Sequence, residues 1–98
     1  MRRIYPTCEP VDDEDIVAAY AYPAGHQPYV RANMVASLDG AAWGPDGRSG
    51  SLSTPADRRV FHVLRGLADV ILAGAATVRT ERYGPAAAPE RLRSHRAS

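Results

Sequence analysis

The sequence predicts an α/β fold, and three consecutive segments carry that prediction. Residues 29–38 alternate apolar and polar side chains as a strand does, and residues 55–67 repeat apolar side chains with the period of a helix. Residues 70–73 are a short apolar run, typical of a strand buried on both faces of a sheet. A strand, a helix and a second strand in succession form a crossover unit. We therefore expect a mostly parallel sheet with flanking helices.

Length and composition narrow the possible functions. The 98 residues form one domain or part of one, and 45% of them are apolar, as in an ordinary folded protein. The net charge is only +1, so we expect neither a nucleic-acid nor a membrane partner. The sequence shows no apolar core of a targeting signal and no run as long as a membrane span, so we expect a cytoplasmic location. The arginines at 91, 93 and 96 are the best candidates for nucleic-acid binding. No aromatic residues on which bases could stack lie between them, so this function ranks last. Cys8 is the only cysteine, which excludes an intrachain disulfide and a cysteine-based zinc site.

Residues 1–28 read as an amino-terminal extension with one short helix. Acidic residues at 12–15 suit the positive end of a helix dipole. Ile16, Val17 and Tyr20 then give the helix one apolar edge.

The first predicted strand covers residues 29–38 and ends at a turn. Five apolar side chains alternate onto one of its faces: Val30, Ala32, Met34, Ala36 and Leu38. The Asp39-Gly40 pair favours a turn, and Pro45-Asp46-Gly47 predicts another. Residues 48–53 are small and polar, which indicates a loop.

The helix predicted from about Pro55 to Leu67 has the clearest start in the chain. Thr54 can cap it, Pro55 fits its first position, and Asp57 can bond back to the cap. Its apolar stripe consists of Val60, Phe61, Leu64, Leu67 and Ala68. Beside the stripe, Arg65 is either a solvated arginine or a bidentate phosphate ligand, and His62 is best read as a partly buried packing residue.

The second predicted strand ends at Gly74, and residues 75–79 begin a turn or helix. A glycine at this place lets a ligand approach the backbone, and a nucleotide phosphate is one such ligand. Many α/β strands end in glycine for steric reasons alone, so both interpretations stay open. After Pro85 the periodicity is lost, and residues 86–98 read as a disordered tail.

Three stretches in order resemble the reductase domain of bacterial bifunctional deaminase-reductases of riboflavin synthesis. They are N-M-V-A-S-L-D-G at 33–40, G-R-S-G-S-L-S at 47–53, and the A-D-R-R helix with its L-R pair and T-V turn at 54–83. The resemblance implies a dihydrofolate-reductase-like fold. It also implies an NADPH-dependent oxidoreductase that reduces the ribosyl group of an aminopyrimidine ribosyl phosphate by hydride transfer.

The resemblance also assigns site residues. It implies substrate contacts at Ser49 and Arg65, and cofactor contacts at five positions: Val35, Ser51, Gly74, Thr77 and Glu81. It leaves the catalytic proton donor unidentified and implies no metal. Three positions depart from the family pattern: Ser51 is often tryptophan there, Glu81 is usually aspartate, and Ala41 is commonly basic.

The domain implied by the resemblance is incomplete in this chain. Family domains continue well beyond this length, with further strands and a Gly-rich phosphate loop, and nothing in residues 86–98 replaces them. Residues 29–85 are therefore expected to be the amino-terminal half of the reductase domain, inactive alone. The alternative is a non-catalytic remnant or binding module completed by a partner chain. The expected ligand is a small phosphorylated ribosyl-pyrimidine or a related molecule, and the complete protein is a possible homodimer.

Overall fold

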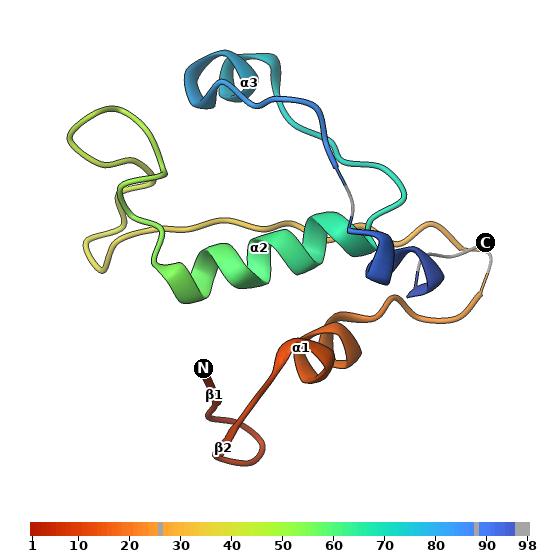
Figure 1. Cartoon of the computed structure of the whole chain (residues 1–98). Coiled ribbons are helices and arrows are strands. Elements are labelled where there is room, and N and C mark those ends of the chain that lie inside the picture. The colour runs from red at the N-terminus through yellow and green to blue at the C-terminus, as the bar shows by residue number, and fades with distance from the viewer. Residues whose placement is uncertain (26, 88, 96–98) are drawn as a thin grey trace.

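The computed structural model describes residues 1–25, 27–87 and 89–95, and its elements give a mixed α/β chain. Strands β1 (Arg2–Arg3) and β2 (Glu9–Pro10) form an antiparallel pair. The helices are α1 (Asp13–Tyr20), α2 (Pro55–Leu67), α3 (Ala75–Glu81) and the 3₁₀ helix η1 (Glu90–His95). Figure 1 shows α2 at the centre, with α1 on one side of it and α3 set apart on the other. In the described part of the chain no helix is long and apolar enough to cross a membrane.

The two capped helices begin where their sequences predict. In α1, Asp12 Oδ1 accepts from the Asp15 amide at 2.9 Å, and Asp15 Oδ2 accepts from the Asp12 amide at 2.9 Å. In α2, Thr54 Oγ1 accepts from the Asp57 amide at 3.1 Å, and Pro55 occupies the first turn. Each cap satisfies amides that have no partner within the helix. The predicted bounds of the long helix are confirmed, and residues 75–79 are helical within α3.

The core is small and lies where α1, α2 and η1 meet. It consists of five buried side chains: Ile16, Val17, Val63, Leu67 and Leu92. The predicted stripe of α2 is therefore only partly right, because Phe61 and Leu64 are half-buried and do not belong to this core. The packing partners α1 and η1 cover the face with Val63 and Leu67, so Phe61 is left on another face.

The predicted strand at residues 29–38 is wrong as a strand. The segment is extended in Figure 1 but makes no ladder within the described residues. Its apolar face points outward: Val30 is 85% exposed and Met34 is 82% exposed, whereas Val35 and Ser37 are partly buried. Backbone amides and carbonyls form a strand only when a neighbouring strand pairs with them. Residues 29–38 have the alternating pattern of a strand, but no neighbouring strand pairs with them among the described residues.

The buried strand predicted at residues 70–73 is wrong for the same reason, and so is the mostly parallel sheet. These residues have no strand assignment, and Val70 and Leu72 are exposed. Among the described residues, the one sheet is the antiparallel β1–β2 pair, at a place where the sequence shows no strand pattern. Arg3 and Glu9 face each other across that pair and form an ion pair.

The expected disordered tail also needs correction at η1. Leu92 is only 1% exposed, and it packs against α2 where Gly66 leaves space. A Cβ at position 66 would lie 2.2 Å from Leu92 Cδ1, so the glycine permits this close contact. Burial of this apolar side chain favours the packing of the short 3₁₀ helix against the core. Ala88 and residues 96–98 of the predicted tail lie outside the described residues.

Candidate functional site

An open cavity of about 650 Å³ lies between α2, α3 and the segments that precede α2. We call it the site cavity. Its walls come from residues 33–35, the loop from 42 to 53, the first two turns of α2, and α3 with Tyr83. Its volume is within the range of small-molecule sites, about 300–1,000 Å³.

The loop that precedes α2 is shaped by two turns. Gly40 and Gly47 have φ values of 88° and 74°, which glycine adopts without strain. Asp46 Oδ1 accepts from the Arg48 amide at 3.1 Å, and the Gly44 amide donates to the Arg48 carbonyl at 2.8 Å. The turns predicted at 39–40 and 45–47 are therefore present. They direct the 47–50 segment toward α3.

Ser49 and Glu81 meet at the wall of the site cavity. Glu81 Oε1 accepts hydrogen bonds from both the amide and the hydroxyl of Ser49, each at 2.8 Å. These two bonds, the amide first, hold the pKa of Glu81 below its ordinary value because they stabilise the carboxylate. Two residues that are 32 positions apart are thus joined directly, and both line the cavity.

Val35 and Thr77 also line the site cavity, so it contains four of the seven residues that the family resemblance assigns. Gly74 does not line it and stands one residue before α3, as its cap. Its φ of −64° does not require glycine, and a Cβ there would meet only Thr77 Oγ1, at 3.9 Å.

Ser51 and Arg65 lie outside the cavity wall. The Ser51 hydroxyl is turned into its own loop, within reach of Asp46 Oδ1 at 3.2 Å and the Arg48 carbonyl at 3.3 Å. The Arg65 guanidinium lies over the rings of Phe61 and Tyr83, at 5.3 and 5.7 Å from their centroids. Both rings line the cavity, so Arg65 connects α2 to the segment after α3 and stands directly behind the wall.

Several residues that line the cavity were not predicted from the sequence: Asn33, Trp43, Arg58, His62 and Tyr83. His62 is exposed, so its reading as a partly buried residue is wrong. Arg58 and His62 are separated by one helical turn, and this spacing puts both on one face of α2. The four-residue spacing shows from the sequence that Arg58 and His62 share a face of α2, but it does not show that this face borders a cavity.

The site cavity suits a flat ring bearing hydrogen-bonding groups. Trp43, Phe61 and Tyr83 present aromatic surfaces, and Thr77 presents a hydroxyl. Both lining carboxylates already accept hydrogen bonds: Asp57 from Ser53 Oγ at 2.6 Å, and Glu81 from Ser49. Across residues 1–25, 27–87 and 89–95, no group of three or more His, Cys, Asp or Glu side chains could hold a metal ion.

Comparison with known families identifies the family of the chain. Residues 28–96 match the family model described as RibD C-terminal domain. The match begins next to the first predicted strand and covers all the assigned site residues. No curated protein and no solved structure matches the chain. The family match confirms the resemblance to the riboflavin-pathway reductases that the sequence shows.

Proposed function

Because this chain belongs to the RibD C-terminal domain family, we propose that it supplies the amino-terminal part of an NADPH-dependent reductase site. The proposed reaction reduces the ribosyl group of an aminopyrimidine ribosyl phosphate to a ribityl chain by hydride transfer. The fold proposed for the complete domain is dihydrofolate-reductase-like.

One observation carries this proposal. Val35, Ser49, Thr77 and Glu81 come from three separate segments, and all four line the site cavity. The family resemblance selects these residues from motif matches alone, without reference to any cavity. Their convergence on one cavity is the expected consequence if they act on a common ligand.

The residues of the cavity fit part of NADPH. Trp43 and Tyr83 offer flat faces for a ring, and Thr77 offers a hydroxyl to a polar group. Arg58 supplies a positive charge for a phosphate. When bound, the cofactor supplies the hydride for the reduction. The protein's share is to orient the two reactants and to keep water from the space between them.

Ser49 and Arg65 are proposed to hold the substrate. The amide and hydroxyl of Ser49 already converge on one carboxylate oxygen, which is the arrangement that an oxyanion of a substrate needs. Arg65 lies behind the aromatic wall and has a planar fork suited to a phosphate. For Arg65 to reach the cavity, its guanidinium must leave the Tyr83 ring.

A non-catalytic binding module completed by a partner chain is the second candidate. The outward apolar face of residues 30–38 favours it, because such a face is stable in water only when another element covers it. Further strands of the same domain and a separate partner chain would both cover that face. The two candidates differ in whether NADPH binds in the site cavity.

The test of the proposed function is NADPH affinity in Thr77 variants of this chain. Removal of one hydrogen bond costs about 0.5–1.5 kcal/mol, so Thr77→Ala is expected to weaken NADPH binding by a few-fold to about tenfold. Thr77→Ser keeps the hydroxyl and is expected to bind like the parent. Titration followed by nicotinamide fluorescence gives both values. If Thr77→Ala and the parent bind NADPH with equal affinity, Thr77 has only a structural role in α3.

A further inference from the structure

We propose that a second, basic cavity between α1, α2 and η1 binds a phosphate monoester. The cavity has a volume of about 460 Å³ and is lined by neither Thr77 nor Glu81, although Arg58 and His62 line both cavities. Its occupant is inferred from charge and shape and not from the family match.

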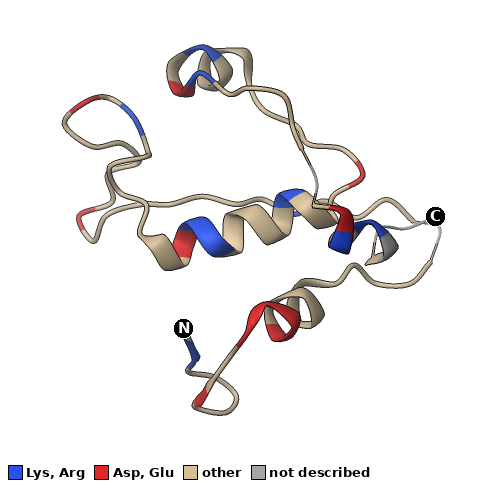
Figure 2. Cartoon of the chain, viewed as in Figure 1, with Lys and Arg blue, Asp and Glu red and all other residues tan. Residues whose placement is uncertain are grey.

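Regular spacing on α2 builds one wall of the basic cavity. Pro55, Arg59 and Val63 recur every four residues, and Arg58 and His62 lie beside them. The opposite wall comes from η1 through Arg91 and Leu92, and Asp13 of α1 closes one end. Figure 2 shows acidic residues in the first turn of α1 and basic residues on α2 and η1.

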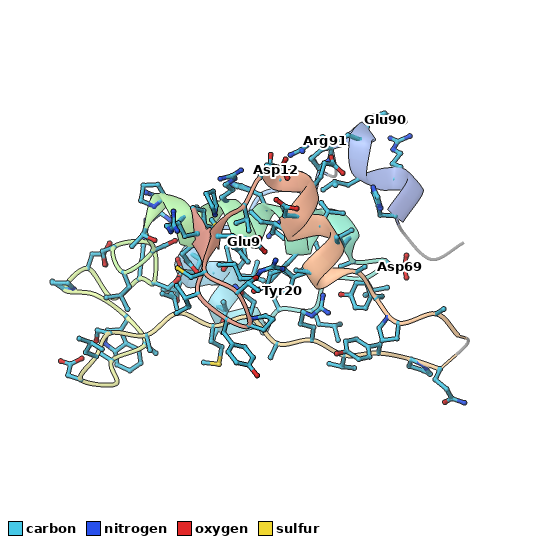
Figure 3. All side chains as sticks on the ribbon, turned by 90° about the horizontal axis from the view of Figure 1, so that it is seen from below. Glu9, Asp12, Tyr20, Asp69, Glu90 and Arg91 are labelled. Carbon is cyan, nitrogen blue, oxygen red and sulfur yellow. The ribbon has the colours of Figure 1, made fainter. Side chains whose placement is uncertain are left out.

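The arginines of the basic cavity outnumber its acid. Asp13 accepts from Arg59 Nε at 2.6 Å through Oδ1, and its Oδ2 lies 3.2 Å from Arg91 Nη2. In Figure 3, Arg91 extends from η1 toward the start of α1, where Asp12 is labelled. The Arg58 side chain has no hydrogen-bond or ion-pair partner among the described residues. Three guanidinium groups and one carboxylate leave two positive charges uncompensated, which matches the charge of a phosphate monoester.

The prolines of the basic cavity indicate what the phosphate is attached to. Pro55 and Pro89 line the cavity and are exposed, whereas Val63 and Leu92 are 2% and 1% exposed and already buried in the core. A free phosphate ion would leave the proline surface in contact with water. An ester whose apolar or flat body covers the prolines gains from burial, while its phosphate meets the guanidinium forks. The basic cavity therefore suits a phosphate monoester better than inorganic phosphate.

Replacement of Asp13 tests the proposal, because a binding site and a purely structural ion pair predict different effects on phosphate affinity. Its carboxylate competes with an incoming anion for Arg59 and Arg91. If the cluster serves only to tie α1 to α2 and η1, Asp13→Asn simply weakens that tie. If the cluster is a binding site, the same change frees two guanidinium groups and tightens phosphate binding.

The experiment measures phenyl phosphate binding to the 98-residue chain by calorimetry at low ionic strength, with inorganic phosphate as the second probe. We expect phenyl phosphate to bind more tightly than inorganic phosphate. Arg91→Ala is expected to weaken binding about tenfold, because one charge-assisted contact is lost. The matched control is Arg93→Ala on the same helix, since Arg93 pairs with Glu90 at 3.0 Å and lies outside the cavity.

Two further variants complete the test. Asp13→Asn is expected to bind phenyl phosphate several-fold more tightly, and Thr77→Ala, which alters only the site cavity, is expected to bind it unchanged. Circular dichroism of each variant confirms that the helices are retained. Absence of binding in the parent, or equal losses in Arg91→Ala and Arg93→Ala, would overturn the proposal. Weaker binding in Asp13→Asn would overturn it as well and leave a structural ion-pair network.

Discussion

At the scale of single residues, Glu81 links α3 to the loop that contains Ser49, and its charge decides the strength of that link. Its pKa is lowered in the folded chain, so the carboxylate contributes stability above the ordinary glutamate pKa. That contribution is lost as the pH falls through the lowered value. We expect the Ser49 amide resonance to titrate with a midpoint below that of an ordinary glutamate.

The control for this titration is Glu81→Gln, whose side chain still offers an oxygen to Ser49 but carries no charge. Its Ser49 resonance is expected to show no such transition. A parent midpoint at or above the ordinary glutamate value, measured by NMR across the acidic range, would mean that Ser49 and Glu81 are not bonded in solution.

Arg65 carries the second prediction at this scale. In a complete domain, Arg65→Ala is expected to raise the apparent dissociation constant of the phosphorylated substrate about tenfold or more and to leave that of NADPH nearly unchanged. Arg79→Ala is the matched control, since Arg79 is exposed on α3 and lies outside both cavities. If Arg65→Ala weakened NADPH and substrate equally, the stacking on Phe61 and Tyr83 would be its main role.

The motifs assign seven site residues, and the structure brings four of them to one cavity. Ser49, Thr77 and Glu81 were identified by motif, because a motif fixes the spacing along the chain. Ser51 was assigned by the same reasoning, yet its hydroxyl turns toward Asp46 within its own loop. Loop geometry decides where such a side chain points, and residue spacing does not determine loop geometry.

At the scale of elements, the packing of η1 against α2 gives the third prediction. Leu92→Ala removes a fully buried side chain from a five-residue core, and such a change typically costs about 2–5 kcal/mol. We expect the unfolding midpoint in urea to fall, or cooperative unfolding to disappear. Leu72→Ala is the control, because Leu72 is exposed and its loss is expected to change little. Equal effects from the two variants would show that η1 does not pack on the core in solution.

Local sequence signals account for which elements were predicted correctly. The ends of α2 follow from Thr54, Pro55 and the apolar period, all of which act within one or two turns. The β1–β2 pair is too short for any period to be visible, and it depends on contacts between residues 2–3 and 9–10. The order at η1 depends on a fit between Leu92 and Gly66, which are far apart in the sequence.

At the scale of the whole molecule, the missing sheet explains most of the difference between prediction and structure. Residues 29–38 keep the alternation of a strand, but their apolar face is exposed and no other strand pairs with them among the described residues. A sheet is a long-range property, so two candidate strands do not form one unless they meet each other or a third strand. In this chain they meet neither among the described residues.

The fourth prediction follows from these unpaired segments. The 98-residue chain alone is expected to show no NADPH oxidation with an aminopyrimidine ribosyl phosphate, followed at the absorbance band of reduced nicotinamide. Hydride transfer needs both reactants held close together, and a displacement of about 1 Å already costs about a hundredfold in rate. Substrate-dependent oxidation by this chain would show that its site is complete.

The most direct test of the central claim is an NMR titration of the chain with NADPH. The account predicts that backbone amide resonances around the site cavity shift with a common saturation curve, Ser49, Thr77 and Glu81 among them. Resonances of the Ile16 and Val17 amides in the core are expected to stay in place. If NADPH leaves the site-cavity resonances unmoved, or shifts residues all over the chain equally, the proposed cofactor site is wrong.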